Sequence, residues 1–329
     1  MPLGHVVLPG EVEETVRAVF GQAGARWIDE LPGVVAALAE RWGLTGFSAP
    51  FRGGTHAYVA AVQRADRSRV VLKVPMVDEE NVAEATALHV YAGDGAVRLL
   101  DFDPGSGALL LEWARPGTEL LHQPGFPSLE GRPENAEKVA FACGLYRRLR
   151  RPVGVVPAVF PSFPFATEVV DGLRGRLDAA NPELAELLSD RLRADLDYWC
   201  GVLAEPDGPL LIVNRDTHLG NIVAAEREPW LLIDPKPCLG EAAFDAGFLL
   251  MIQAQSNPTR EHANAVVAAT AAALAVDPAR ARGWALVRAV EEMVWAIDDE
   301  DHDMLALHTA VAYALADAPL PPYARATVT

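Results

Sequence analysis

Positive charge is scarce in this sequence. The 329 residues include 28 Lys and Arg against 45 Asp and Glu, which gives a net charge of −17. A negative field repels polyanions, so the composition argues against nucleic acid as a partner and favours cationic ones. An anionic ligand would require positive charge placed locally at its site.

Cysteine is also rare. Cys143, Cys200 and Cys238 are scattered and stand mostly among apolar residues, without the spacing of a metal site. The histidines likewise show no zinc pattern. We therefore expect buried free thiols in a reducing compartment and no disulfide framework.

Long hydrophobic runs and internal repeats are missing. The longest apolar tract, 265–276, is too short to span a bilayer, and residues 1–10 lack the basic start and apolar core of a signal peptide. Half of the residues are nonetheless hydrophobic, and the length allows two lobes with a sizeable core. We expect a cytoplasmic globular protein without a membrane partner.

The most informative stretch is a polar segment between two apolar runs. The run 210–213 leads into Asp216 and Asn221, and the run 230–233 stops at Asp234. This order predicts strand, loop, strand, loop, with an acidic residue at the end of each strand.

These three side chains fit a division of labour. Mg²⁺ prefers oxygen ligands, which Asn221 and Asp234 would supply, while Asp216 would accept a proton from an attacking hydroxyl group. The spacing matches the D-x-x-x-x-N part of a kinase catalytic loop, with Asn214 where that pattern has His. A β-hairpin with polar turn residues is the alternative, and it would be preferred if the motif stood alone.

A lysine inside an apolar strand supports the kinase interpretation. Lys73 lies in the run 70–74, where a charge needs a partner unless the strand is at an edge and the side chain reaches water. Glu84, in the helix predicted over 81–91, is the expected partner, with Glu79 and Glu80 as rivals. At a separation of about 4 Å and an effective dielectric near 20, the attraction is about 4 kcal/mol before desolvation.

Two further segments fit nucleotide binding, each with a simpler alternative. Gly53, Gly54 and Thr55 would let backbone N–H groups approach phosphates, although an ordinary hairpin turn fits the same residues. The strand 108–111 runs into a Pro-Gly segment, 112–117, which is either a linker or a hinge whose backbone at Glu112 and Ala114 binds the adenine edge.

The sequence thus predicts an α+β fold with two lobes of the protein-kinase type. The expected domains are a nucleotide-binding lobe at 1–111 with a helical cap, a hinge at 112–117, and a mainly helical catalytic and substrate lobe at 118–329. The first lobe is expected to contain helices at 11–20 and 31–42 and an antiparallel sheet of strands at 46–51, 57–63, 69–74, 97–102 and 108–111.

Two acidic positions later in the chain have open roles. Asp298 and Asp299 begin an acidic run at a helix C-terminus, which is either a solvated loop or a cluster that receives a cationic substrate. Asp245 opens a helix and is expected to cap it, with bracing of the catalytic loop as the alternative.

The residues in 213–223 and 225–237 resemble the aminoglycoside/hydroxyurea phosphotransferases, in particular their streptomycin 6-phosphotransferase branch. Trp27-Ile28, Leu31-Pro32, Trp42, Leu72-Lys73, 93–100 and 295–299 carry the same resemblance over most of the chain. It implies a kinase-like fold and ATP-dependent O-phosphorylation of an antibiotic. Carried over by position, Asp216 is catalytic, Asn221 and Asp234 bind Mg²⁺, and Lys73 binds phosphate with Glu84 as its partner.

The chain departs from that family at two positions. Asn214 stands where the family commonly has His, and Arg215 stands where a small residue is frequent. Arg215 would either lower the pKa of Asp216 or bind phosphate, and the departures leave the acceptor open. A streptomycin-like cationic antibiotic is expected. A metabolite or nucleoside-antibiotic kinase and a nucleotide sensor without transfer activity are the rivals. The lack of an A-P-E segment disfavours a protein kinase.

Overall fold

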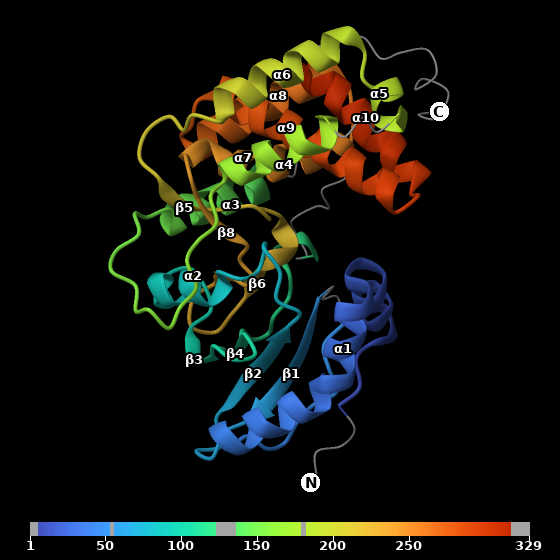
Figure 1. The fold of residues 1–329 in the computed structure, drawn as a ribbon. Helices are drawn as coiled ribbons and strands as arrows, with labels where there is room; N and C mark the ends of the chain where they lie inside the picture. The colour runs from blue at the N-terminus through green and yellow to red at the C-terminus, as the bar shows by residue number, and fades with distance from the viewer. Residues whose placement is uncertain (1–5, 53–55, 123–135, 179–181, 317–329) are drawn as a thin grey trace. The chain divides into compact units, whose positions relative to one another are not determined.

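The computed structural model describes residues 6–52, 56–122, 136–178 and 182–316 (Figure 1). The chain forms two compact units. The first comprises 1–117 together with two later segments, 155–162 and 225–231, and the second comprises the remaining residues. A single cut at the predicted hinge therefore does not separate the two units, because the chain returns to the first unit twice.

The first unit contains a four-stranded antiparallel sheet in the order β1-β2-β4-β3. Its strands are β1 (Ala57–Gln63), β2 (Arg69–Pro75), β3 (Leu99–Asp103) and β4 (Ala108–Glu112). The strand expected at 46–51 is reduced to isolated bridges from Thr45 and Pro50 to β1. The prediction of an antiparallel sheet here is confirmed.

A long helix, α1 (Gly10–Trp42), covers one face of this sheet (Figure 1). Two helices were expected, and they join here through a kink at Gly21, where φ is 52°. Leu31, Val35 and Leu38, at helical spacing, pack against sheet residues that include Leu72. Because side chains alternate along a strand, Leu72 on this face places Lys73 on the opposite face.

Helix α2 (Glu84–Tyr91) begins three residues later than predicted. The reason is Asn81, whose side chain accepts from the Asp78 N–H and donates to the Met76 carbonyl, so that a turn precedes the helix. The first residue of the helix is therefore Glu84. This start fixes the position of that carboxylate close to β2.

The second unit is mainly helical, as predicted. Its helices are α3 (Ala136–Leu149), α4 (Thr167–Asp178), α5 (Pro182–Leu187), α6 (Asp190–Leu203), α7 (Ala246–Gln255), α8 (Arg260–Leu274), α9 (Pro278–Asp298) and α10 (His302–Ala316). Helix α9 is buried along most of its length and packs against α7 and α10 (Figure 1). No helix in the described part of the chain is long and apolar enough to cross a membrane.

Short strands carry the predicted catalytic segment. They are β5 (Leu211–Asn214), β6 (Ile222–Ala224), β7 (Trp230–Leu232) and β8 (Pro237–Gly240), and β5 pairs with β8 in antiparallel register. Asn214 lies opposite Pro237 at the end of that pair. The pairing thus brings the chain around Asp216 close to the chain just after Asp234.

Candidate active site

Lys73 and Glu84 form the predicted ion pair in the first unit. Lys73 is 6% exposed and Glu84 is 1% exposed, and Nζ of the lysine lies 2.6 Å from Oε2 of the glutamate. The rivals Glu79 and Glu80 precede the helix, whereas Glu84 begins it. The two buried side chains thus form a close pair of opposite charges. The binding of phosphate by Lys73 stays a prediction.

The predicted hinge begins with a residue whose groups are largely engaged. The Glu112 N–H donates to the Arg98 carbonyl, and the carboxylate accepts from the Arg98 N–H and from Arg227. The Glu112 N–H is therefore already used in the first unit. Binding of adenine by Ala114 stays a prediction, and Gly53, Gly54 and Thr55 lie outside the described residues.

Asp216 lies in the loop after β5, in the second unit, and its Oδ2 has two neighbours. Nδ2 of Asn221 donates to it over 3.0 Å, and Nε2 of His218 lies 3.4 Å away. Asn221 ends a single turn of 3₁₀ helix, Leu219–Asn221, whose first N–H groups are capped when Nδ1 of His218 accepts from Gly220. The five-residue spacing from Asp216 to Asn221 thus closes a compact loop.

Asp234 is joined to this loop through the backbone. The N–H of Ile233 donates to the carbonyl of Asn221 over 2.8 Å, so Asp234 directly follows a residue that is bonded to Asn221. Asp234 itself has φ of 47°, a left-handed conformation that is uncommon for a residue with a side chain. The structure therefore brings Asp216, Asn221 and Asp234 together in the second unit.

Asn214, which stands where the kinase pattern has His, joins two loops through its side chain. Its Oδ1 accepts from the N–H of Asp216 and from the N–H of Lys236, at 3.3 and 2.9 Å. One side-chain oxygen thereby ties the loop of the predicted base to the loop of the predicted metal ligand Asp234.

Asp245 braces the loop, so the expectation that it caps a helix is wrong. Its side chain makes no cap at the start of α7. Instead Oδ1 accepts from the Asn214 N–H and Oδ2 accepts from Nε of Arg150, with both charged side chains buried. The backbone carbonyl of Asp245 also accepts from the Thr217 hydroxyl. Backbone and side chain together fix the strand end from which Asp216 projects.

His218 lowers the pKa of Asp216, and the sequence analysis gave this histidine no role. Burial on its own raises the pKa of Asp216, but the hydrogen bond and charge of His218, with the charge of Lys236, hold that pKa below its ordinary value. Burial would lower the pKa of His218, but Asp216 and then Asp234 raise it. The position of a histidine two residues after the predicted base was the signal available in the sequence.

Arg215 is directed to helix α9. Its Nη2 lies 2.5 Å from Oε1 of Glu291, and its guanidinium stands 6.0 Å from the ring centre of Trp295. The groups that lower the pKa of Asp216 are His218 and Lys236. Arg215 thus forms an ion pair with Glu291 and is not among the groups that lower the pKa of Asp216, and its binding of phosphate or substrate stays a prediction.

The two acidic residues proposed for the substrate lie at the far end of α9. Asp298 pairs with Arg176 of α4, and both side chains are half exposed. Asp299 is the C-cap residue of α9. These contacts explain Asp298 as part of a surface ion pair, and its contact with a substrate stays a prediction.

The donor set around Asn221 and Asp234 suits magnesium. No group of three or more His, Cys, Asp or Glu in the described residues is placed to hold a metal ion. Mg²⁺ commonly needs fewer protein ligands, because it keeps several waters and binds substrate phosphates as well. One carboxylate and one amide oxygen fit that pattern, and Nδ2 of Asn221 faces Asp216, so Oδ1 is the amide atom left for a cation.

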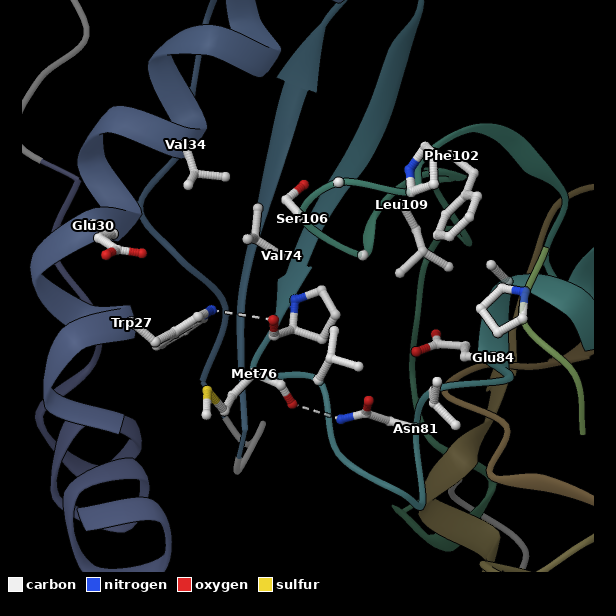
Figure 2. A pocket seen from close by; sticks show the side chains of 18 of the residues that line it. Trp27, Glu30, Val34, Val74, Met76, Asn81, Glu84, Phe102, Ser106 and Leu109 are labelled. Atoms are coloured by element: carbon white, nitrogen blue, oxygen red, sulfur yellow. Dashed lines mark hydrogen bonds between the residues drawn. The ribbon is translucent and has the colours of Figure 1, made fainter. Parts of the chain in front are cut away.

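A cavity of about 600 Å³ lies in the first unit (Figure 2). Its wall is formed by Trp27 and Val34 of α1, by Val74 at the end of β2 with Met76 just after it, and by Glu84 of α2. Nε1 of Trp27 donates to the Pro75 carbonyl and fixes the indole at the edge (Figure 2). The carboxylate that pairs with Lys73 thus also borders this space.

Comparison with known proteins gives a consistent result. A family model described as aminoglycoside/hydroxyurea antibiotic resistance kinase matches residues 41–300. The chain is 34% identical over 318 residues to a hydroxyurea phosphotransferase of Kitasatospora aureofaciens, covering 95% of this chain and 87% of that protein. It is 33% identical over 320 residues to a streptomycin 6-kinase of Streptomyces griseus, covering 95% and 98%.

Solved structures agree on the fold. An aminoglycoside phosphotransferase crystallised with ADP and hygromycin B has a TM-score of 0.55 at 12% identity, covering 86% of this chain and 97% of that one. A choline kinase of Streptococcus pneumoniae has a TM-score of 0.57 at 12% identity, covering 87% and 99%. The predicted kinase-like fold is confirmed.

Proposed function

The chain belongs to the aminoglycoside/hydroxyurea antibiotic resistance kinase family, and from this we propose that it transfers the γ-phosphoryl group of ATP to a hydroxyl group of a small antibiotic. One observation carries the proposal. Asn221 donates to Asp216 through its side chain and accepts from Ile233, next to Asp234, through its backbone. One loop system therefore holds the side chains that would serve as the proton acceptor and as the two oxygen ligands for a cation.

Asp216 would act as the base. Its Oδ2 is engaged by Asn221 and His218, so Oδ1 is the atom that would orient the acceptor hydroxyl and take its proton. The lowered pKa keeps the carboxylate ionised at neutral pH, which a proton acceptor requires. A base of this kind contributes about 10²–10⁴-fold to the rate.

The remaining residues would hold the nucleotide. Lys73, aimed by Glu84, would bind phosphate oxygens, and Asn221 with Asp234 would bind Mg²⁺. Bound with ATP, the metal ion would offset charge on the phosphates. Most of the rate enhancement in such reactions comes from positioning and electrostatics, so rigid placement of these side chains matters more than their reactivity.

The acceptor is proposed from the relatives. Two matching proteins, from Streptomyces griseus and Streptomyces glaucescens, are streptomycin 6-kinases, and the net charge of −17 suits a cationic acceptor. Streptomycin is therefore our first candidate. Hydroxyurea is the second, because the hydroxyurea phosphotransferase is equally similar at 34% identity.

A panel assay tests both candidates. The purified protein is incubated with Mg²⁺·ATP and streptomycin, hygromycin B, hydroxyurea, a nucleoside antibiotic or choline, and the products are weighed by mass spectrometry for one added phosphate. Asp216→Ala is expected to lower turnover about 10²–10⁴-fold while calorimetry shows ATP binding retained. An equal loss of turnover and of ATP binding in Asp216→Ala would contradict the proposal. ATP binding by the wild-type chain without product from any acceptor would also contradict it.

A further inference from the structure

Arg227 has every one of its side-chain donors engaged. Nε and Nη2 donate to the two carboxylate oxygens of Glu112, at 2.8 and 2.9 Å. Nη1 donates to the Gly93 carbonyl at 2.6 Å and to Glu228, and Nη2 also donates to the Ala96 carbonyl at 2.9 Å. A guanidinium has five N–H groups, and five hydrogen bonds account for all of them.

The partners of Arg227 are two fixed points of the first unit. Gly93 and Ala96 belong to the turn that follows α2, and Gly93 has a left-handed φ of 83°. Glu112 ends β4, and its Oε2 also accepts from the N–H of Arg98, which directly precedes β3. Arg227 therefore binds where the end of the sheet meets the end of the helix that carries Glu84.

Arg227 lies in the chain between the two proposed magnesium ligands, Asn221 and Asp234. It belongs to the segment 225–231, which forms part of the first unit although residues on both sides belong to the second. Asn221 lies six positions before it and Asp234 seven positions after it. The two ends of this excursion are tied in the second unit by the bond from the Ile233 N–H to the Asn221 carbonyl.

We infer that Arg227 is a positioning residue: by anchoring 225–231 to Glu112 and the Gly93–Ala96 turn, it fixes the backbone that carries the two proposed magnesium ligands, Asn221 and Asp234. This inference rests on the proposed function. The anchor itself lies wholly within the first unit, because Arg227, Glu112 and the Gly93–Ala96 turn all belong to it. Arg227 touches neither nucleotide nor acceptor in this scheme.

The chemistry of the anchor selects arginine. The planar fork matches a carboxylate with two parallel bonds, and the remaining donors reach two carbonyl groups that face different directions. A lysine ammonium has three donors at one point and cannot make both sets. Arg227 keeps its charge at all working pH values, because the hydrogen bond to Glu112 raises its pKa further.

The alternative is a purely structural role, in which Arg227 only stabilises the first unit. The two possibilities differ in which part of the chain exchanges its amide hydrogens faster after a substitution. Loss of general stability would speed amide exchange across β1, β2 and β4 alike. Loss of positioning would act on the segment 221–234 and on the metal dependence of the reaction.

The experiment compares Arg227→Met and Arg227→Lys with Arg17→Met. Arg17 is a matched control, because it pairs with Glu13 on the exposed surface of α1. Hydrogen exchange followed by mass spectrometry is measured on peptides covering 219–234 and on peptides from β1 and β2. We expect exchange in 219–234 to accelerate about 10-fold or more in Arg227→Met and less in Arg227→Lys, with β1, β2 and the control unchanged.

Kinetics supply the second readout. We expect the Mg²⁺ concentration for half-maximal turnover and the KM for ATP to rise about 10-fold in Arg227→Met, with the acid limb of the pH profile unmoved because Asp216 keeps its neighbours. Glu112→Gln is expected to raise the Mg²⁺ concentration for half-maximal turnover and the KM for ATP as well.

Wild-type metal dependence and wild-type exchange in 219–234 would overturn the inference, as would faster exchange spread evenly over the first unit. Absence of any phosphorylated product from the wild-type chain is a failure of the proposed function instead. The exchange arm still decides whether Arg227 anchors the segment in that case.

Discussion

Replacing Glu84 by Gln isolates the charge of the buried pair while leaving its volume almost unchanged. Nζ of Lys73 lies 2.6 Å from Oε2 of Glu84, and both side chains are nearly fully buried. At an effective dielectric near 20, the Coulomb attraction at that distance is about 6 kcal/mol. Glutamine can still accept a hydrogen bond from the ammonium, which is worth about 1.5–3 kcal/mol.

The difference predicts a loss of about 3–5 kcal/mol in the free energy of unfolding of the first unit, which agrees with the usual effect of removing one partner of a buried pair. Glu13→Gln, in an exposed i,i+4 pair with Arg17, is the control and should change stability by about 0.2–0.5 kcal/mol. The same change at Glu84 releases the lysine from its fixed direction. ATP binding should therefore weaken along with stability.

Because the chain has two units, the assay must report on the first alone. Hydrogen exchange of the β2 amides in rising urea gives that local free energy, and calorimetry gives the ATP affinity. A loss of less than about 1 kcal/mol in Glu84→Gln would refute the reasoning, since the pair would then be no stronger than a surface one. The double variant Lys73→Met with Glu84→Met separates stability from function: most of the stability should return, and ATP binding should not.

Two further predictions concern the loop of Asp216. In His218→Asn, the amide oxygen can still accept from the Gly220 N–H, but the hydrogen bond and the charge that lower the pKa of Asp216 are lost. The pKa of Asp216 should therefore rise, and the acid limb of the kcat profile should move to higher pH. An unmoved limb would contradict this prediction. In the wild type, the lowered pKa of Asp216 adds stability above pH 3.8, and this stability is lost as the pH falls through the folded pKa. The raised pKa of His218 adds stability below pH 6.5, and this stability is lost as the pH rises through the folded pKa of His218. Urea titrations should therefore find the full contribution of both groups between pH 3.8 and 6.5. Asp245→Asn keeps an acceptor for the Asn214 N–H but leaves the Arg150 guanidinium buried without its counter-charge; it should destabilise the second unit by about 3–5 kcal/mol in chemical denaturation, and a change within about 0.5 kcal/mol would show that the loop is braced by other contacts.

Patterns that depend on neighbouring residues could be read from the sequence. Leu31, Val35 and Leu38 recur at the spacing of a helix face, and the short valine-rich apolar run around Lys73 is typical of a strand. The start of α2 was misplaced because the side chain of Asn81 bonds the backbone and delays the helix, an effect that apolar periodicity does not record.

Resemblance in the segment 213–237 was enough for the family and its kinase-like fold. The five-residue spacing between Asp216 and Asn221 was enough to propose a base and a metal ligand, because that spacing is local and its chemistry follows from the residue types.

Tertiary structure decided what each of those residues touches. The role of Asp245 as a brace depends on Arg150, which lies 95 positions away, and the anchor at Arg227 depends on Glu112, 115 positions away. No local pattern specifies such partners, since the carboxylate of Asp245 or Glu112 could equally cap a helix, face solvent or pair with another residue. Only the folded chain brings these charges within hydrogen-bonding distance.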